Sequence, residues 1–373
     1  CGAQSGLNAD FSGNGTNDSV QAVSSNGTAA VSWTATTATD VGYDDNSLTI
    51  SYANAAGTTK ETGDSFAIGL HVITATATDG ASNATTCTFN IRVADTAVPN
   101  AITCGAQSGL NADFSGNGTN DSVQAVSSNG TQAVSWTATT ATDLGYAANT
   151  LTISYANAAG TTKASGDSFA IGAHTITATA TDGSSNATTC NFSIRVADTA
   201  APNSITCGAQ SGLNADFSGD GTNDAVQATS DNAAVVSWTA TSATDAGYAA
   251  NSLTIAYANA AGTTVASGDS FSIAQHTITA TATDGSSNAT TCNFNIRVAD
   301  TAAPDTITWG AQRGLTAYCS GDGTNDSVQA VSSNGTAAVA WTAATATDVG
   351  YADNTLTISY ANAAGTTKAS GDS

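Results

Sequence analysis

The chain repeats a unit of about 100 residues along its whole length. The octapeptide CGAQSGLN begins at Cys1, Cys104 and Cys207, and a variant of it, WGAQRGLT, begins at Trp309. A period of this length corresponds to a whole domain rather than to one turn of a solenoid. We therefore predict tandem domains at residues 1–103, 104–206 and 207–308, with an incomplete fourth at 309–373. Because the fourth copy stops before its last third, we expect that the chain is an excerpt of a longer protein or a mature form trimmed at both ends.

The chain is strongly acidic. The chain has seven lysine and arginine residues and 29 aspartate and glutamate residues, which gives a net charge of −22. Nucleic acid and anionic membrane surfaces repel such a chain, so we expect neither as a partner. No apolar run approaches the roughly 20 residues that a membrane-spanning helix needs, so we expect no membrane insertion. Near-identical tandem units favour reach and multivalency over catalysis, and we do not expect an enzyme.

Alternation of apolar and polar residues predicts β-strands throughout each repeat. In residues 86–93 (TCTFNIRV) every second side chain is Cys, Phe, Ile or Val, and in residues 71–78 (HVITATAT) apolar residues alternate with threonine. Turn signals such as Asn-Gly and Asp-Gly separate these runs. About seven short strands, one core tryptophan and one cysteine pair per repeat are typical of an immunoglobulin-like sandwich. The prediction is an all-β chain of tandem immunoglobulin-like β-sandwich domains that form an extended rod.

Each complete repeat carries two cysteines, one as its first residue and one in its last strand. Both are expected to point into the core, where a disulfide would typically stabilise the fold by about 2–5 kcal/mol. Closely spaced cysteines, which a metal site needs, are absent. The predicted pairs are Cys1 with Cys87, Cys104 with Cys190, and Cys207 with Cys292. Disulfides indicate an oxidising compartment, so we predict an extracellular or cell-surface protein. The odd Cys319 has no partner in its repeat, and both sequence drift and a bridge to another chain stay open.

Several motifs of the repeat resemble the HYR (hyalin repeat) domain. They are VSWT at residues 31–34, ATD at 38–40, ITATATDGASNATTCTF at 73–89, and the junction from VAD to ITC at 93–104. Ser82 stands where the family usually has a second glycine, and Gly105 follows the junction cysteine where the family usually has proline. The segment from about residue 4 to 28 looks like an insertion. The resemblance implies an immunoglobulin-like fold in extracellular adhesive or matrix proteins, and it does not imply catalysis.

The inserted segment contains an acidic loop in each complete repeat. Residues 216–224 (DFSGDGTND) resemble calcium loops of the type D-x-[DNS]-x-[DN]-G-x-x-D. Calcium takes six to eight oxygen ligands, and alternate positions of a tight loop can converge on it. The predicted ligands are Asp10, Ser12, Asn14, Thr16 and Asp18; Asp113, Ser115, Asn117, Thr119 and Asp121; and Asp216, Ser218, Asp220, Thr222 and Asp224. The alternative is a polar hairpin whose carboxylates are incidental. In the fourth repeat Tyr318 replaces the first aspartate, which should end calcium binding there.

A second place for cations is the short junction at residues 95–100 (DTAVPN), whose aspartate returns as Asp198 and Asp300. Pro99 cannot rotate about φ, so we expect this junction to be semi-rigid.

Sequons for N-glycosylation are dense, although many such triplets arise by chance in a chain rich in Asn, Ser and Thr. If the source glycosylates, the predicted sites are Asn26, Asn83, Asn129, Asn186, Asn288 and Asn334.

Other recurrent residues are predicted to serve the fold. The histidine at position 71 and its copies mark a strand edge, because no activated serine accompanies them. Trp33 and its copies are core residues rather than sugar platforms. Arg92 and its copies are expected on an outward face, paired with nearby aspartates.

Together these observations predict a structural protein: a stalk, fibre or matrix filament, glycosylated where the source allows and with calcium as a candidate ligand. Its expected partners are copies of itself, through lateral or end-to-end assembly, or other matrix components. Two alternatives place the activity in a domain outside this chain. One is a cell-surface adhesin whose repeats project a binding domain, and the other is a secreted hydrolase that uses these repeats as accessory modules.

Overall fold

The computed structural model describes residues 1–316, 326–352 and 355–373, so Tyr318 and Cys319 lie outside the described residues. The chain divides into two compact units, residues 1–199 and 200–373. Both units are built from β-strands, with short 3₁₀ helices at η1 (Asp45–Ser47), η2 (Ala148–Thr150) and η3 (Ala250–Ser252). None of the described helices has the length and apolar character needed to cross a membrane.

The first repeat folds around a four-stranded sheet in the order β2-β8-β7-β5. Its strands are β2 (Val20–Gln21), β5 (Thr49–Asn54), β7 (Gly69–Thr78) and β8 (Ala84–Ala94). β7 pairs antiparallel with both β5 and β8, while β2 runs parallel to the end of β8. Two short antiparallel ladders complete the repeat: β1 (Gln4–Ser5) with β4 (Ser32–Trp33), and β3 (Thr28–Ala30) with β6 (Ser65–Ala67).

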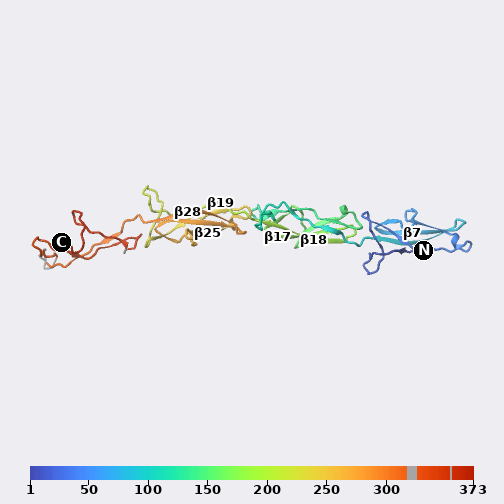
Figure 1. Ribbon diagram of the computed structural model, residues 1–373, viewed down its shortest axis with the longest axis horizontal. Coiled ribbons are helices and arrows are strands. Elements are labelled where there is room, and N and C mark those ends of the chain that lie inside the picture. Colours follow the sequence, from blue (N-terminus) through green and yellow to red (C-terminus); the bar gives the residue numbers. More distant parts are fainter. Residues whose placement is uncertain (317–325, 353–354) are drawn as a thin grey trace. The chain divides into compact units, whose positions relative to one another are not determined.

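The second and third repeats reproduce this pairing. The second contains β10 (Gln107–Ser108), β11 (Val123–Gln124), β12 (Thr131–Ala133), β13 (Ser135–Trp136), β14 (Thr140–Thr142), β15 (Thr152–Asn157), β16 (Ser168–Ala170), β17 (Gly172–Thr181) and β18 (Ala187–Ala197). The third contains β20 (Gln210–Ser211), β21 (Val226–Gln227), β22 (Ala233–Val235), β23 (Ser237–Trp238), β24 (Ser242–Thr244), β25 (Thr254–Asn259), β26 (Ser270–Ser272), β27 (Ala274–Thr283) and β28 (Ala289–Ala299). The four-stranded sheets are β11-β18-β17-β15 and β21-β28-β27-β25, and Figure 1 labels β17, β18, β25 and β28.

The described part of the fourth repeat has fewer strands. They are β29 (Thr306–Thr308), β30 (Gln312–Arg313), β31 (Ala340–Trp341) and β32 (Thr345–Thr347). They form the ladders β29 with β32 and β30 with β31.

A buried core lies between the sheet and the short ladders of each complete repeat. In the first repeat, Val31, Ile73 and Ile91 are fully buried. Trp33 is 6% exposed, and its ring lies 5.5–6.2 Å from the rings of Tyr52, Phe66 and Phe89. The same arrangement recurs around the tryptophans of repeats two and three. The all-β fold with core tryptophans is therefore confirmed, and it follows from alternation that places every second side chain inward.

In the fold, each new repeat begins a few residues before the cysteine with which the sequence repeat starts. β9 (Asn100–Thr103) pairs antiparallel with β14, which belongs to the second repeat. β19 (Asn203–Thr206) pairs in the same way with β24 inside the second unit. The residues that connect two folded repeats are therefore few, at 95–99 between the first and second.

The recurrent histidine and arginine have distinct roles. His71 Nε2 donates to the Ala67 carbonyl at 2.8 Å, and its ring lies 5.3 Å from that of Phe66, so its packing role is confirmed. The predicted pairing of the arginines with aspartates is wrong, although Arg92 is partly exposed between the buried Ile91 and Val93. The Arg92 guanidinium lies over the ring of Phe11, 4.2 Å from its centroid, and the copies in repeats two and three do the same. A guanidinium is planar and more weakly hydrated than an ammonium, so it stacks readily on an aromatic face.

Candidate functional site at the junction of the first two repeats

Three aspartates converge where the first repeat meets the second. Asp95 directly follows β8, while Asp143 and Asp182 directly follow β14 and β17. One carboxylate oxygen of each lies within 4.8 Å of the others. Asp95 is 4% exposed and Asp182 is 7% exposed. Because each residue continues a paired strand, the backbone of the strands holds the three side chains in place.

The Asp95 carboxylate is anchored on one side by its own repeat. Gln21, on β2, donates from Nε2 to Asp95 Oδ1 at 2.5 Å, and the Ala97 N–H donates to the same oxygen at 3.1 Å. The other end of the Gln21 amide accepts from the backbone N–H and the hydroxyl of Thr96. One glutamine thus fixes the chain as it leaves the first repeat.

The Asp182 carboxylate organises the turn between β17 and β18. Its Oδ1 accepts the backbone N–H groups of Ser184 and Asn186, at 2.8 and 2.9 Å. Asn186 Nδ2 donates to Asp182 Oδ2 at 2.9 Å and also to the Asp95 carbonyl at 3.1 Å. This second bond connects the two repeats directly.

Two oxygen atoms of the cluster are buried without a hydrogen-bond partner. They are Oδ2 of Asp95 and Oδ2 of Asp143. Burial, together with the negative charges of Asp143 and Asp182, raises the pKa of the Asp95 carboxyl. At an effective dielectric near 20, two unit charges at such a separation repel by roughly 3 kcal/mol. Buried carboxylates are ordinarily paired or bound to a metal, so this arrangement calls for a counter-charge.

Gly145 allows the two repeats to approach this closely. A Cβ atom at this position would lie 2.5 Å from Asp95 Oδ2 and 2.6 Å from Asp95 Cγ. The Gly145 N–H meanwhile donates to Asp143 Oδ1 at 3.0 Å. A side chain here would force either the Asp95 carboxylate or the second repeat to move.

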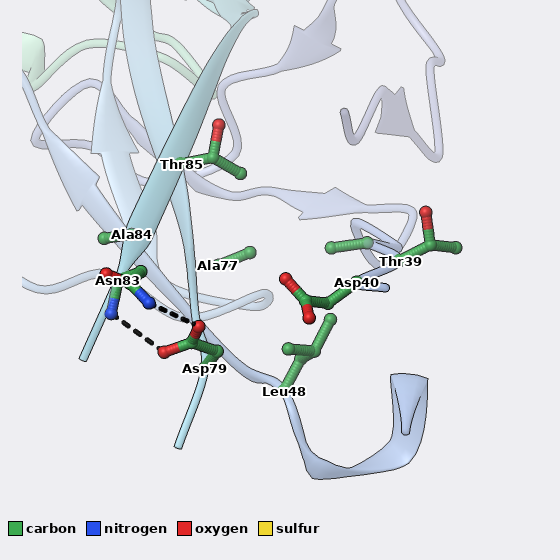
Figure 2. Close-up of a pocket in the computed structure, with 9 residues that line it drawn as sticks. Thr39, Asp40, Leu48, Ala77, Asp79, Asn83, Ala84 and Thr85 are labelled. Carbon is green, nitrogen blue, oxygen red and sulfur yellow. Dashed lines mark hydrogen bonds between the residues drawn. The ribbon is translucent and has the colours of Figure 1, made fainter. Parts of the chain in front are cut away.

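The first repeat shows the same side chains without a carboxylate from another repeat (Figure 2). Asp40, Asp79 and Asn83 are its equivalents of Asp143, Asp182 and Asn186. They line a hollow of about 150 Å³ that also includes Leu48 and Thr85. The dashed lines in Figure 2 mark the bonds from Asn83 to Asp79, which lower the pKa of Asp79. Asp40 and Asn83 are exposed here, whereas Asp182 is buried at the junction.

The sequence pointed to only one member of this cluster. Asp95 and its copies were named as a place for cations, but Asp143 and Asp182 were not. Their equivalents in the first repeat, Asp40 and Asp79, end the motifs already noted there, ATD at 38–40 and TATD at 76–79. The recurrence of an aspartate directly after each of these strands was the available signal.

The structure joins the cysteines in the pairs that the sequence predicts. Disulfides link Cys1 to Cys87, Cys104 to Cys190 and Cys207 to Cys292, each with its Cα atoms 5.8 Å apart. Each bond connects the start of a repeat to its last long strand.

The acidic loops form tight turns in which the carboxylates accept hydrogen bonds from the loop itself. Asp10 accepts the N–H groups of Gly13, Asn14 and Gly15 at 2.6–3.1 Å. Asp18 accepts from the backbones of Phe11 and Ser12. A hydrogen bond from the Ser12 side chain, together with that from the Phe11 backbone, lowers the pKa of Asp18, and the backbone N–H of Gly221 lowers the pKa of Asp216. The three aspartates of residues 216–224 are not among the close carboxylate groups in the described part of the chain. Calcium binding by these loops stays a prediction.

The predicted glycosylation sites differ in their surroundings. Asn26, Asn83, Asn129 and Asn334 are exposed, and Asn186 and Asn288 are half-buried. Both Asn186 donor bonds come from the amide nitrogen to which a glycan would be attached. The geometry therefore argues against a glycan on Asn186, and the exposed sites stay predictions.

The solved structures that match this chain include two bacterial adhesins and a protocadherin. A Ca²⁺-stabilized adhesin of an ice-binding Antarctic bacterium is 17% identical, with 84% of this chain and 77% of that chain covered and a TM-score of 0.29. A 1.5-MDa bacterial ice-binding adhesin is 14% identical over 75% of this chain and 93% of that chain, with a TM-score of 0.28. Extracellular cadherin domains 3–6 of protocadherin gamma B2 are 14% identical over 82% and 75%, with a TM-score of 0.23. No curated protein sequence matches the chain.

The model of the HYR domain matches the chain three times, at residues 15–93, 117–196 and 222–298. Each match begins within the segment that the sequence suggested to be an insertion, so part of that segment belongs to the domain. The matches cover more than half of the chain and coincide with its three complete repeats. The chain therefore belongs to the HYR domain family and is an extracellular repeat protein with disulfide-closed repeats.

Proposed function

We propose that this chain is a load-bearing segment of an extracellular stalk, fibre or matrix filament, and that it carries no catalytic activity. The observation that supports the proposal is where the disulfides lie along the chain. Each one joins the first residue of a repeat to the strand through which the chain leaves it. Tension along the chain therefore passes through the disulfide and bypasses the rest of the repeat.

The covalent path through the second repeat illustrates the effect. The load enters at Cys104, crosses to Cys190 and continues along β18 toward Ala197. The 86-residue separation between the two cysteines would add about 300 Å to a fully stretched chain if it were released. While the disulfides are intact, only the segments outside them can extend. Segments between repeats, such as residues 87–104, can add at most about 60 Å each, and residues 293–373 can add at most about 280 Å.

Calcium binding by the acidic loops forms a second part of the proposal. The positions with oxygen-bearing side chains in residues 10–18 already fold back on one another, and Gly15 adopts a positive φ of 82° that permits the tight bend. A calcium titration of the wild-type chain and of Asp121→Asn tests it. A loop that binds calcium should lose one ion in the variant, and unchanged stoichiometry would remove this part of the proposal.

Force spectroscopy on single chains held at both ends tests the mechanical part. The oxidised chain should stretch without releasing the length enclosed by any disulfide. After reduction, each complete repeat should unfold separately and add about 300 Å. The segments outside the disulfides can together add at most about 400 Å, most of it from residues 293–373, so a larger release from the oxidised chain would contradict the proposal.

The alternative is an adhesin whose repeats project a binding domain. Negative-stain microscopy of the purified assembly separates the two functions. Ordered filaments of repeating subunits support the structural function, whereas isolated molecules that end in a distinct head support the adhesin.

A further inference from the structure

We propose that the carboxylates of Asp95, Asp143 and Asp182 bind one calcium ion, which locks the first repeat to the second. The site is separate from the acidic loops, because it is assembled from strand ends of two repeats rather than from one loop.

The distances match a shared cation. Calcium binds oxygen at 2.3–2.6 Å, so two oxygens on one ion can be separated by at most about 5 Å. The three carboxylate oxygens lie within 4.8 Å of one another. No bond within the protein occupies Oδ2 of Asp95 or Oδ2 of Asp143, although both atoms are shielded from solvent. These two oxygens are therefore available as ligands.

The chemistry of the cluster selects a hard divalent cation. Its ligands are carboxylate oxygens, without a histidine or cysteine in the group. Such ligands suit calcium, magnesium and manganese rather than zinc or copper. Calcium accepts irregular coordination completed by water and backbone carbonyls, whereas magnesium demands a near-ideal octahedron. Carboxylates on three separate strand ends give an irregular site, which favours calcium.

The first repeat provides an internal comparison. Asp40 and Asp79 occupy the positions of Asp143 and Asp182, and there the carboxylate equivalent to Asp95 is missing from this chain. Asp40 is exposed, so water can solvate its charge and it needs no counter-charge. The third carboxylate, supplied by the neighbouring repeat, is what creates the need for a cation. The ion would thus join the end of β8 to the ends of β14 and β17, beside the hydrogen bond from Asn186 to the Asp95 carbonyl.

Calcium titration of the 373-residue chain tests this site, with Asp143→Asn as the variant and Asp40→Asn as the matched control. Asparagine keeps the oxygen that accepts from Gly145, removes the charge and replaces Oδ2, the proposed ligand atom, with an amide nitrogen. By calorimetry, Asp143→Asn should bind one calcium ion fewer than wild type, and Asp40→Asn should bind the same number. Magnesium should give a weaker response than calcium, and an equal response would overturn the assignment to calcium.

Thermal unfolding gives a second test. Aspartates that only supported the fold would not reverse their effect on the melting temperature when calcium is added. In chelator, Asp143→Asn should melt above wild type, since a buried repulsion is removed. In about 5 mM calcium it should melt below wild type, because the ion is lost. Asp95→Asn, which keeps the acceptor for Gln21, should show the same reversal. The proposal would be overturned if Asp143→Asn bound as many calcium ions as wild type, or if it were stabilised equally with and without calcium. Either result would indicate that protonation of a carboxyl group, rather than a bound ion, relieves the repulsion.

Discussion

Replacing Gly145 with alanine tests whether the first two repeats contact each other as closely as the structure indicates. The added Cβ would lie 2.5 Å from Asp95 Oδ2, 2.6 Å from Cγ and 3.1 Å from Cβ of the same residue. Real Cβ atoms do not approach this closely, so either the carboxylate or the second repeat must move. Gly145 does not have a positive φ, so alanine brings no backbone strain of its own.

Gly42, the equivalent glycine of the first repeat, is the matched control. A Cβ there meets only its own loop, at 3.4 Å from Asp40 Oδ1. Gly42 is exposed and also lacks a positive φ. Both substitutions remove the same conformational freedom from the unfolded chain, which stabilises by about 0.4–1 kcal/mol. Only the change at Gly145 adds an overpacking cost, typically about 1–3 kcal/mol.

We expect Gly145→Ala to destabilise its unit by about 1–2 kcal/mol, and Gly42→Ala to be neutral or mildly stabilising. For a unit of this size the first change corresponds to a fall in melting temperature of about 2–8 °C. Scanning calorimetry and urea unfolding of the whole chain measure both. Gly350→Ala should repeat the effect in the second unit, where a Cβ would lie 2.5 Å from Asp300 Cγ. Equal stabilities for Gly145→Ala and Gly42→Ala would refute the close contact.

Three further predictions concern the repeats themselves. Replacing Cys104 and Cys190 by serine opens an 86-residue loop and should cost about 4–5 kcal/mol in urea unfolding, whereas a loss below about 1 kcal/mol would argue against the entropic account. Phe114→Ala removes the ring beneath Arg195, 4.3 Å from its centroid, and should cost about 0.5–1 kcal/mol; the exposed Leu110→Ala serves as a control for lost apolar surface. Hydrogen bonds from Asn83 lower the pKa of Asp79, so its stabilising effect is present above pH 3.8 and is lost as the pH falls through the lowered value. Asp79→Ala should therefore melt below wild type at neutral pH, with a gap that closes in acid, and a constant gap would contradict this.

The repeat architecture was accessible from the sequence because its causes are local. Alternation in residues 71–78 and 86–93 predicts which face of β7 and β8 is inward, and the structure buries Ile73 and Ile91 as expected. The place of a cysteine on such an inward face then predicts its partner. Both inferences need only the period-two geometry of a strand.

The arginine contacts were not accessible in this way. Arg92 stands on β8, and Phe11 belongs to a loop 81 positions earlier in the sequence. No periodic pattern relates the two positions, and a carboxylate-rich chain made aspartate the obvious partner. Only the fold shows that the loop brings Phe11 onto the guanidinium.

By itself the sequence determined the all-β repeat, its core tryptophans, its disulfide pairs and its HYR family membership, because near-neighbour spacing and repetition encode them. The tertiary structure alone decided where the charge gathers. Asp95, Asp143 and Asp182 are separated by 48 and 39 positions along the chain, and the sequence singled out only Asp95 among them. They form a cluster only because the connection at residues 95–99 is short and Gly145 has no side chain. The Asp95 carboxylate of the first repeat can therefore approach Asp143 and Asp182 of the second. Long-range convergence of this kind depends on the packing of whole repeats, which no local pattern records.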